Sequence, residues 1–310
     1  MPVKRLYIIG YYNYRNTGDD AIKIGLLHGI NLRGEGNHTF DLHAKGESWR
    51  TILRKICCAD LVILGGGTHM RDWGRGRWKQ CLRIVALGIL VRSLGKRFHM
   101  INIGIDGAKS EYISRRVANV VTVRDRDTFD SSVLIPYQAR PREKALGVNL
   151  TPVHRLYFGR PDRDRMVLQN VVKALLEWKT RHREWSIRFY SFNGDPVLGD
   201  DEMNAQAAAL VPDAEFFPWQ PDVVTTIEAV SSCSAFTGMR YHSCVFAYIT
   251  GTPSLIIETY PSCTGLAGFV GLPLVGMNEV LDGSFKLSFG KAATLPVQEA
   301  KKLALEGIVL

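Results

Sequence analysis

The chain has 310 residues, of which 46% are hydrophobic and 22% charged, as is ordinary for a soluble globular protein with room for about two domains. No apolar run approaches the roughly 20 residues of a membrane-spanning helix, and the first residues lack the long apolar region of a signal peptide. We therefore expect a cytoplasmic protein. Its net charge of +9 favours anionic partners, which include nucleic acid, anionic membranes and phosphorylated small molecules.

The first half of the chain alternates short apolar strands with helices. Strands are predicted at residues 4–9, 59–64, 98–103 and 121–123, and helices at residues 21–30, 83–94 and 114–120. Alternation of this kind is typical of a doubly wound parallel sheet. The predicted fold class is therefore α/β.

The second half repeats this alternation after a break near residues 147–161. Strands are predicted at residues 155–158, 186–190, 214–217, 234–238 and 254–257, and helices at residues 166–180, 201–210, 222–232, 242–250 and 296–310. Two α/β domains are expected, residues 1–150 and 151–310, with the C-terminal helix as a candidate for packing back on the N-terminal domain. A ligand would then bind at the strand ends that face a cleft between the domains.

The stretch GMRYHSCVFAYITGTPSLII, Gly238–Ile257, places Arg240 and His242 where a strand gives way to a helix. A helix N-terminus offers unpaired N–H groups and the positive end of a dipole, so it favours anions. An arginine there can hold a phosphate or carboxylate with two parallel hydrogen bonds, and a histidine can exchange a proton near neutral pH. The alternative is a capping histidine beside a surface arginine.

Three glycines, Gly65–Gly67, end an apolar strand. They would let the backbone approach a ligand or bind an anion, unless they only form a tight turn. They match neither the Walker loop nor G-x-G-x-x-G, which disfavours a nicotinamide or flavin cofactor. In the first loop, Asp19 or Asp20 either caps the first helix or accepts a proton from a sugar hydroxyl. At another strand end, Arg124 either faces the ligand crevice or forms a surface pair with the aspartate that follows it.

Two further patterns point more weakly to function. His69 and Asp72 are too few ligands to predict a metal site, so no metal is expected. The basic stretch Arg71–Lys79 contains Trp73 and Trp78, whose rings could stack nucleic-acid bases, although a partly covered loop is the plainer interpretation. None of the six cysteines forms a Cys-x-x-Cys pair. Reduced, buried thiols are expected, with a disulfide or zinc framework as the alternative.

Taken together and in order, these stretches resemble the polysaccharide pyruvyl transferases. The resemblance covers about residues 4–130 and 222–275. Its motifs here are GYYNYRNTGDDAI, DLVILGGG, NIGIDG, the tripeptide Val123-Arg124-Asp125 and GMRYHSCVFAYITGTP. The resemblance implies two Rossmann-like domains arranged as in GT-B glycosyltransferases. It also implies transfer of a pyruvyl group from phosphoenolpyruvate to a sugar of a cell-surface polysaccharide or its precursor, with formation of a cyclic ketal.

The resemblance also implies roles for individual residues. His242 would act as an acid or a phosphate ligand, and Asp19 would orient or deprotonate the acceptor. The residues implied to bind substrates are Asn16, Gly18, Gly65, Gly66, Gly67, Arg124, Arg240 and Tyr241. The reaction requires no metal or cofactor besides phosphoenolpyruvate as donor substrate. The acceptor would be a sugar or lipid-linked oligosaccharide, and the basic surface would suit the inner face of an anionic membrane.

In one position the chain departs from the family pattern. Similar proteins often carry a lysine after the Gly-x-Pro motif, where this chain has Ser262. Two alternatives to pyruvyl transfer therefore stay open. The first is a GT-B glycosyltransferase that uses a nucleotide sugar. The second is a non-enzymatic module that binds an anion or nucleic acid.

Overall fold

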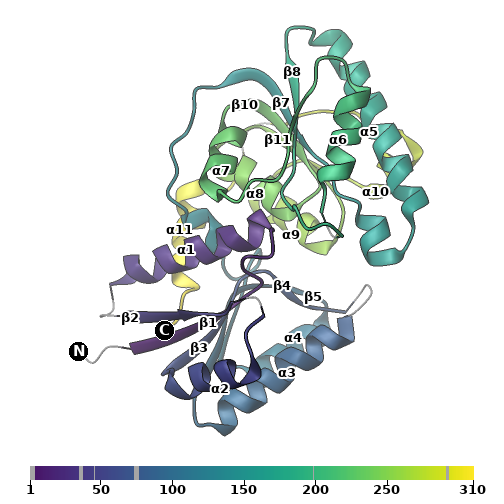
Figure 1. Ribbon diagram of the computed structural model, residues 1–310. Helices are drawn as coiled ribbons and strands as arrows, with labels where there is room; N and C mark the ends of the chain where they lie inside the picture. The colour runs from purple at the N-terminus through teal and green to yellow at the C-terminus, as the bar shows by residue number, and fades with distance from the viewer. Residues whose placement is uncertain (1–3, 35–37, 45, 73–76, 198, 291–292) are drawn as a thin grey trace. The chain divides into compact units, whose positions relative to one another are not determined.

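The computed structural model describes residues 4–34, 38–44, 46–72, 77–197, 199–290 and 293–310. The chain forms two compact units. Unit 1 consists of Met1–Tyr14, Asp19–Ile135 and Gln298–Leu310, and unit 2 consists of Arg15–Gly18 and Pro136–Val297. Each unit is built on a parallel β-sheet with helices on both faces (Figure 1). The predicted α/β class is therefore confirmed.

The units do not divide where the sequence pattern breaks. The chain passes from unit 1 to unit 2 at Ile135 and Pro136, before the expected boundary at residue 150. The reason is the strand β7 (Glu143–Asn149), which pairs with strands of the second sheet. The C-terminal segment Gln298–Leu310 is counted with unit 1.

Unit 1 contains a sheet in the order β2-β1-β3-β5-β4, with β6 pairing with β5, and all of these pairs are parallel. Its strands are β1 (Lys4–Ile9), β2 (His38–Leu42), β3 (Leu61–Gly65), β4 (Thr68–Arg71), β5 (Arg97–Asp106) and β6 (Val120–Val123). Its helices are α1 (Thr17–Arg33), α2 (Trp49–Cys58), α3 (Arg77–Ser93), α4 (Ala108–Val117) and α11 (Val297–Glu306). Figure 1 shows α2, α3 and α4 on one side of this sheet and α1 with α11 on the other.

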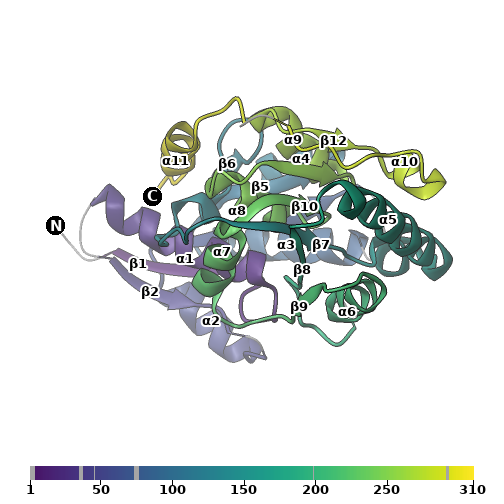
Figure 2. The same ribbon diagram turned by 90° about the horizontal axis from the view of Figure 1, so that it is seen from above.

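Unit 2 contains a second parallel sheet, in the order β12-β11-β10-β7-β8-β9. Its strands after β7 are β8 (Ser186–Tyr190), β9 (Glu215–Phe217), β10 (Cys233–Gly238), β11 (Ser254–Ile257) and β12 (Leu274–Val275). Its helices are α5 (Pro161–Arg181), α6 (Asp201–Leu210), α7 (Val223–Ser231), α8 (Tyr241–Ile249), α9 (Pro261–Val270) and α10 (Met277–Asp282). In Figure 2, α5 lies between α6 and α10, and these helices share one core with the sheet.

One predicted strand is wrong. Residues 155–158 belong to a π-helical turn, His154–Phe158, that leads into α5. The carboxylate of Asp164 on α5 accepts the backbone N–H groups of His154 and Arg155, at 2.9 and 2.7 Å. These bonds satisfy the donors that a strand would have paired with a neighbour.

Two other sequence expectations can be compared with the structure. All six cysteines are reduced thiols, as predicted, but Cys57 and Cys58 are exposed and only the other four are buried. Within the described ranges, no helix combines the length and the apolar character needed to cross a bilayer.

Candidate active site

The carboxyl end of the unit 2 sheet holds the two residues singled out at the strand-to-helix junction. Strand β10 ends at Gly238, which lies in register with Asn149 at the end of β7. The N–H of Met239 donates to the Asn149 carbonyl at 3.0 Å, and the N–H of Arg240 donates to Asn149 Oδ1 at 3.2 Å. The backbone leading into α8 is therefore fixed by the neighbouring strand. Ligands of parallel α/β sheets bind at this end of the strands.

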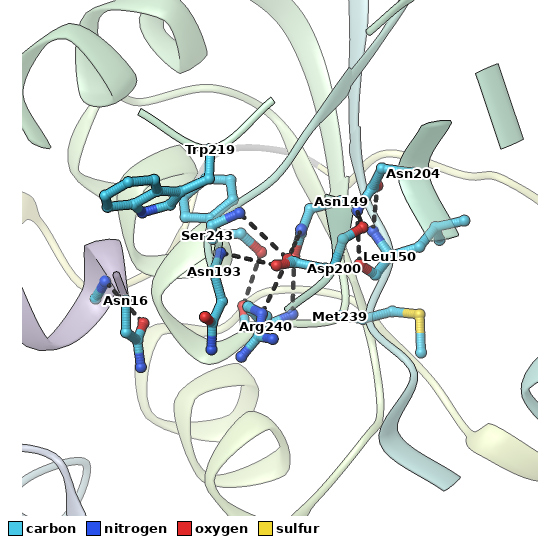
Figure 3. Close-up of polar contacts among 12 residues, drawn as sticks. Asn16, Asn149, Leu150, Asn193, Asp200, Asn204, Trp219, Met239, Arg240 and Ser243 are labelled. Carbon is cyan, nitrogen blue, oxygen red and sulfur yellow. Dashed lines mark hydrogen bonds and ion pairs between the residues drawn. The ribbon is translucent and has the colours of Figure 1, made fainter. Parts of the chain in front are cut away.

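The side chain of Arg240 is held by a buried carboxylate. Its Nε–H donates to Asp200 Oδ2 at 2.9 Å, and Asp200 is fully buried (Figure 3). The same carboxylate accepts Asn149 Nδ2 at 2.8 Å and the Asn193 N–H at 2.7 Å. Burial opposes the charge of the guanidinium, but the Asp200 carboxylate overcomes it and raises the pKa of Arg240. Arg240 therefore stays charged with its head group in a fixed orientation.

Asp200 and Asn149 are functional candidates that the sequence analysis missed. Asp200 stands directly before α6 and has the sequence position of an N-cap, yet its side chain makes no cap hydrogen bond. It turns to Arg240 instead. Asn149 ends a strand that was not predicted, and its Nδ2 also donates to the Tyr190 carbonyl at 2.9 Å. A polar residue at the end of a strand and another before a helix were the available signals, and neither identifies Arg240 as the partner.

The first turn of α8 carries His242, and the side chain of the N-cap residue Arg240 makes no cap hydrogen bond. The N–H of Tyr241 donates to the hydroxyl of Tyr260 at 3.3 Å. The Tyr241 ring is buried and meets the His242 ring edge to face, with 5.0 Å between the centroids. His242 itself is only partly buried. The structure thus gives Tyr241 packing contacts, while its binding role stays a prediction. His242 is partly exposed, but its Nε2 atom is buried.

The segment Arg15–Gly18, which is part of the first loop motif, contacts the region around His242 within unit 2. Asn16 forms an antiparallel bridge with Asn193, and the Thr17 N–H donates to the Phe192 carbonyl at 2.9 Å. Gly18 packs against His242, because a β-carbon at Gly18 would lie 2.1 Å from Nδ1 of the imidazole. Three of the predicted site residues, Asn16, Gly18 and His242, therefore belong to one region.

Arg124 in unit 1 is enclosed by its own neighbours. Its side chain is 2% exposed and pairs through Nη1 with Asp130, which is fully buried. Its Nη2 donates to Thr68 Oγ1 at 3.0 Å, and Asp125 Oδ2 lies 3.8 Å from Nε. Two carboxylates thus compensate its charge. These contacts give Arg124 a structural role within unit 1, and its role as a donor ligand stays a prediction.

The three glycines at the end of β3 lead into a turn on which α1 packs. Gly66 and Gly67 have φ of 59° and 75°, a region that glycine adopts readily. A β-carbon at Gly66 would lie 2.0 Å from Ile22 of α1, and the Gly66 N–H donates to the Ile101 carbonyl at 3.0 Å. The Gly65 carbonyl accepts the Tyr12 hydroxyl at 2.8 Å. Turn geometry and close packing account for these glycines, while their binding role stays a prediction.

The two aspartates at the start of α1 differ in their surroundings. Asp20 Oδ1 accepts the Asn13 N–H at 2.8 Å and lies 3.4 Å from Lys23 Nζ, so it supports the preceding loop. Asp19 lies in the first helical turn and is partly buried. Of the two carboxylates, Asp19 remains the candidate for acceptor chemistry.

The remaining sequence candidates have plainer roles or lie outside the described residues. The carboxylate of Asp72 accepts Ser110 Oγ at 2.6 Å and the Lys109 N–H at 3.1 Å, so it binds the start of α4. In the part of the chain that the structure describes, no group of three or more His, Cys, Asp or Glu residues could hold a metal ion. Trp73 and the side chains of His69 and Trp78 fall outside the described residues. Ser262 is buried near the start of α9.

A comparison with protein families shows to which family the chain belongs. The family model of the polysaccharide pyruvyl transferases matches residues 16–259, a stretch that begins at Asn16 and includes Arg124, Arg240 and His242. The chain belongs to the polysaccharide pyruvyl transferase family. The predicted resemblance is therefore confirmed, and it extends across the middle of the chain. A comparison with curated proteins found no match.

Solved structures with a similar fold come from sugar-nucleotide enzymes. The UDP-GlcNAc 2-epimerase of Methanocaldococcus jannaschii has a TM-score of 0.57 at 9% identity, covering 98% of this chain and 98% of its own. The UDP-GlcNAc 2-epimerase of Neisseria meningitidis, bound to UDP-GlcNAc, has a TM-score of 0.56 at 10% identity, with 98% and 99% covered. The putative UDP-N-acetylglucosamine 2-epimerase of Listeria monocytogenes has a TM-score of 0.56 at 11% identity, with 91% and 87% covered. At such identities the likeness shows the fold alone, and it places this pyruvyl transferase family member in the GT-B fold class.

Proposed function

We propose that the chain transfers a pyruvyl group from phosphoenolpyruvate to a sugar of a cell-surface polysaccharide or its precursor and forms a cyclic ketal. Membership of the polysaccharide pyruvyl transferase family supports this reaction class. The observation that carries the proposal is the arrangement at the start of α8. There Arg240 is fixed by Asp200, and His242 follows in the first turn of α8.

The charges of phosphoenolpyruvate match this arrangement. The molecule carries a phosphate and a carboxylate, and a helix N-terminus favours such groups. A guanidinium has its donors in a fixed fork, so the bond from Nε to Asp200 sets the direction in which Arg240 presents the others. Arg124, by contrast, is enclosed within unit 1, where its side chain is 2% exposed and pairs with the fully buried Asp130. We therefore assign the donor to the residues of unit 2.

The chemistry needs an acid, a base and two hydroxyls. The methylene carbon of phosphoenolpyruvate gains a proton from His242 and becomes a methyl group. The neighbouring carbon forms a bond to the first sugar hydroxyl, whose proton passes to Asp19. A second hydroxyl then forms the second bond to that carbon as the bond to the phosphate oxygen breaks. Its proton passes to His242, which the first step left neutral, and phosphate leaves with the proton held by Asp19. The scheme uses the side chains of the protein and two substrates, and positioned acid–base groups of this kind contribute about 10²–10⁴-fold to a rate.

Binding of the donor can be tested before the acceptor is known. Phosphoenolpyruvate should raise the melting temperature of the wild-type protein and should fail to do so for Arg240→Met, measured relative to each unliganded protein. Glu202→Gln is a matched control, because Glu202 is an exposed charge that pairs only at the surface, with Arg155. Stabilisation by UDP or a UDP-sugar, without any by phosphoenolpyruvate, would overturn the proposal in favour of a nucleotide-sugar transferase.

Turnover tests the proposed acid. With a panel of sugars that carry neighbouring hydroxyls, the wild-type protein should release phosphate from phosphoenolpyruvate only when a suitable acceptor is present. His242→Ala should lower this rate by at least about 10²-fold while it leaves the melting temperature nearly unchanged. An unchanged rate in His242→Ala would remove the proposed acid from the scheme.

A further inference from the structure

Helices α2 and α3 turn their inner sides to the same core. Ile56 of α2 and Ile84 and Val91 of α3 are buried in one cluster with Val62 and Phe98 of the unit 1 sheet. Figure 1 shows the two helices on the same side of that sheet. Their other sides face away from the core, where a surface helix ordinarily presents polar residues of both charges.

The outer side of α3 combines exposed aliphatic and basic side chains. Exposed residues recur at the spacing of one helical face, namely Lys79, Leu82, Arg83, Ala86, Ile89 and Arg92. Leu82 is 65% exposed and Ile89 is 61% exposed. Two large aliphatic side chains therefore stand in water on one stripe, with basic residues at its ends and beside it.

The outer side of α2 has the same composition. Trp49 is 71% exposed, and Leu53, one turn further, is 39% exposed. Arg50 and Arg54 are exposed next to them. Tryptophan is enriched where membrane and water meet, since its ring has an apolar body and a polar N–H group.

The charge of these helices has one sign. Helix α2 contains three basic residues and α3 contains four, and neither contains an acidic residue. By contrast, the surface helix α5 mixes signs, with Asp162, Asp164 and Glu177 among its lysines and arginines. The uniform positive charge favours an anionic partner. The exposed aliphatic and indole groups favour a partner that also has a hydrocarbon region. An anionic bilayer offers both, whereas a nucleic acid has no hydrocarbon region to receive leucine and isoleucine.

We propose that this face is a docking surface for an anionic phospholipid bilayer. The α2–α3 surface is defined by Trp49, Arg50, Leu53, Arg54, Leu82, Arg83, Ile89 and Arg92. Its apolar side chains enter the headgroup boundary, and its guanidinium groups pair with lipid phosphates. The helices lie on the membrane and do not cross it. This inference does not depend on the reaction proposed above.

Co-sedimentation with vesicles tests the surface on the full-length protein. The wild-type protein should partition at least about tenfold more strongly to phosphatidylcholine vesicles with about 30% phosphatidylglycerol than to pure phosphatidylcholine, and less strongly as salt rises. Leu82→Gln with Ile89→Gln should weaken partitioning by a factor on the order of ten or more. Arg83→Gln with Arg92→Gln should weaken it severalfold.

A matched control lies on α5. Met166 and Leu176 are 44% and 38% exposed, so Met166→Gln with Leu176→Gln makes the same kind of change outside the proposed surface. This control should partition like the wild-type protein, and all variants should keep the wild-type melting temperature.

A spectroscopic readout uses the two exposed cysteines. Cys57 and Cys58 lie at the end of α2, and the other four cysteines are buried. A polarity-sensitive thiol dye attached there should shift its emission to the blue with anionic vesicles but not with neutral ones. The variant Cys57→Ser with Cys58→Ser should take up little dye and controls for labelling of buried thiols.

Three results would overturn the proposal. The first is a wild-type protein that stays in the supernatant with anionic vesicles at low salt. The second is equal loss of partitioning in the α5 control. The third is a dimer that forms without lipid and is abolished by Leu82→Gln with Ile89→Gln, which would make the occupant a second copy of the chain.

Discussion

The α-carbon of Gly18 lies directly against the imidazole of His242. A β-carbon at residue 18 would stand 2.1 Å from Nδ1 and 2.4 Å from Cγ, which is closer than unbonded atoms approach. Gly18 does not have a positive φ, so its backbone conformation would allow other residues. Glycine is required at this position because the imidazole leaves no room for a side chain. Gly18 of the first sequence motif therefore fixes the position of His242, which belongs to the last motif.

Gly18→Ala should impair function through His242. The added methyl group must push the imidazole away, and a shift of about 1 Å at a reacting group can cost about 10²-fold in rate. Phosphate release from phosphoenolpyruvate should fall accordingly, and the NMR signals of the His242 ring should move. Gly268→Ala is the control, because a β-carbon at Gly268 would meet nothing within 4 Å. Wild-type turnover together with an unmoved His242 signal in Gly18→Ala would contradict the prediction.

Asp200→Asn should lower the free energy of unfolding much more than a substitution that removes an exposed charge. The change removes the charge that compensates Arg240 and places an amide among donors from Asn149 and Asn193. Breaking a buried ion pair in this way costs about 3–5 kcal/mol, whereas loss of an exposed pair costs about 0–1 kcal/mol. Urea unfolding should therefore show a large loss for Asp200→Asn and a small one for Glu202→Gln. In Arg240→Met the same Asp200→Asn change should cost less, because no buried cation is left uncompensated.

Local sequence patterns predicted much of the fold. The strands 186–190 and 254–257 and the helix 201–210 have the predicted bounds, because a short apolar run and a helical period are properties of adjacent residues. Strand β2, with its polar sequence HTFDL, was missed. It lies at the edge of the sheet and is defined by its pairing with β1.

The candidate site was predictable only in part. Arg240 and His242 were found because a strand, a polar pair and a helix follow one another in the sequence. The partners of these residues were not predictable, since Asp200, Asn149 and Gly18 reach them from distant segments. Arg124 is a second example of contacts that the sequence did not predict. Its position at a strand end suggested a ligand contact, which stays a prediction, whereas its bonds to Asp130 and Thr68 could not be predicted from the sequence.

Asn102→Ala should loosen the attachment of the C-terminal segment within unit 1. Asn102 is fully buried with φ of 49°, and its Nδ2 donates to Ser131 Oγ at 3.0 Å and to the Ala304 carbonyl at 2.9 Å. Alanine leaves both acceptors unpaired and tolerates this backbone conformation less well than asparagine. A loss of about 2–4 kcal/mol in the free energy of unfolding is expected. Asn31→Ala, an exposed position near the end of α1, should change it by less than about 0.5 kcal/mol. Comparable losses in the two variants would rule out the proposed anchoring role.

Acidification below neutral pH should destabilise the protein through two buried histidines. Burial lowers the pKa of both His99 and His154, which are 3% and 5% exposed. His99 Nδ1 lies 2.9 Å from the Val309 carbonyl, so the neutral ring donates there. In the unfolded chain these histidines take up protons below about pH 6.5, whereas in the folded chain they do so only at lower pH.

The sign of the pH dependence follows from this difference. In the window between the two pKa values the unfolded state binds more protons, so the free energy of unfolding falls as pH falls through it. Each unit by which a pKa is lowered corresponds to about 1.4 kcal/mol. Urea unfolding at a series of pH values between about 7 and 5 should therefore show a smaller loss of stability for His99→Gln with His154→Gln than for the wild-type protein. A slope that is unchanged by both substitutions would mean that other groups bind the protons, because glutamine can keep a donor near the Val309 carbonyl but cannot titrate.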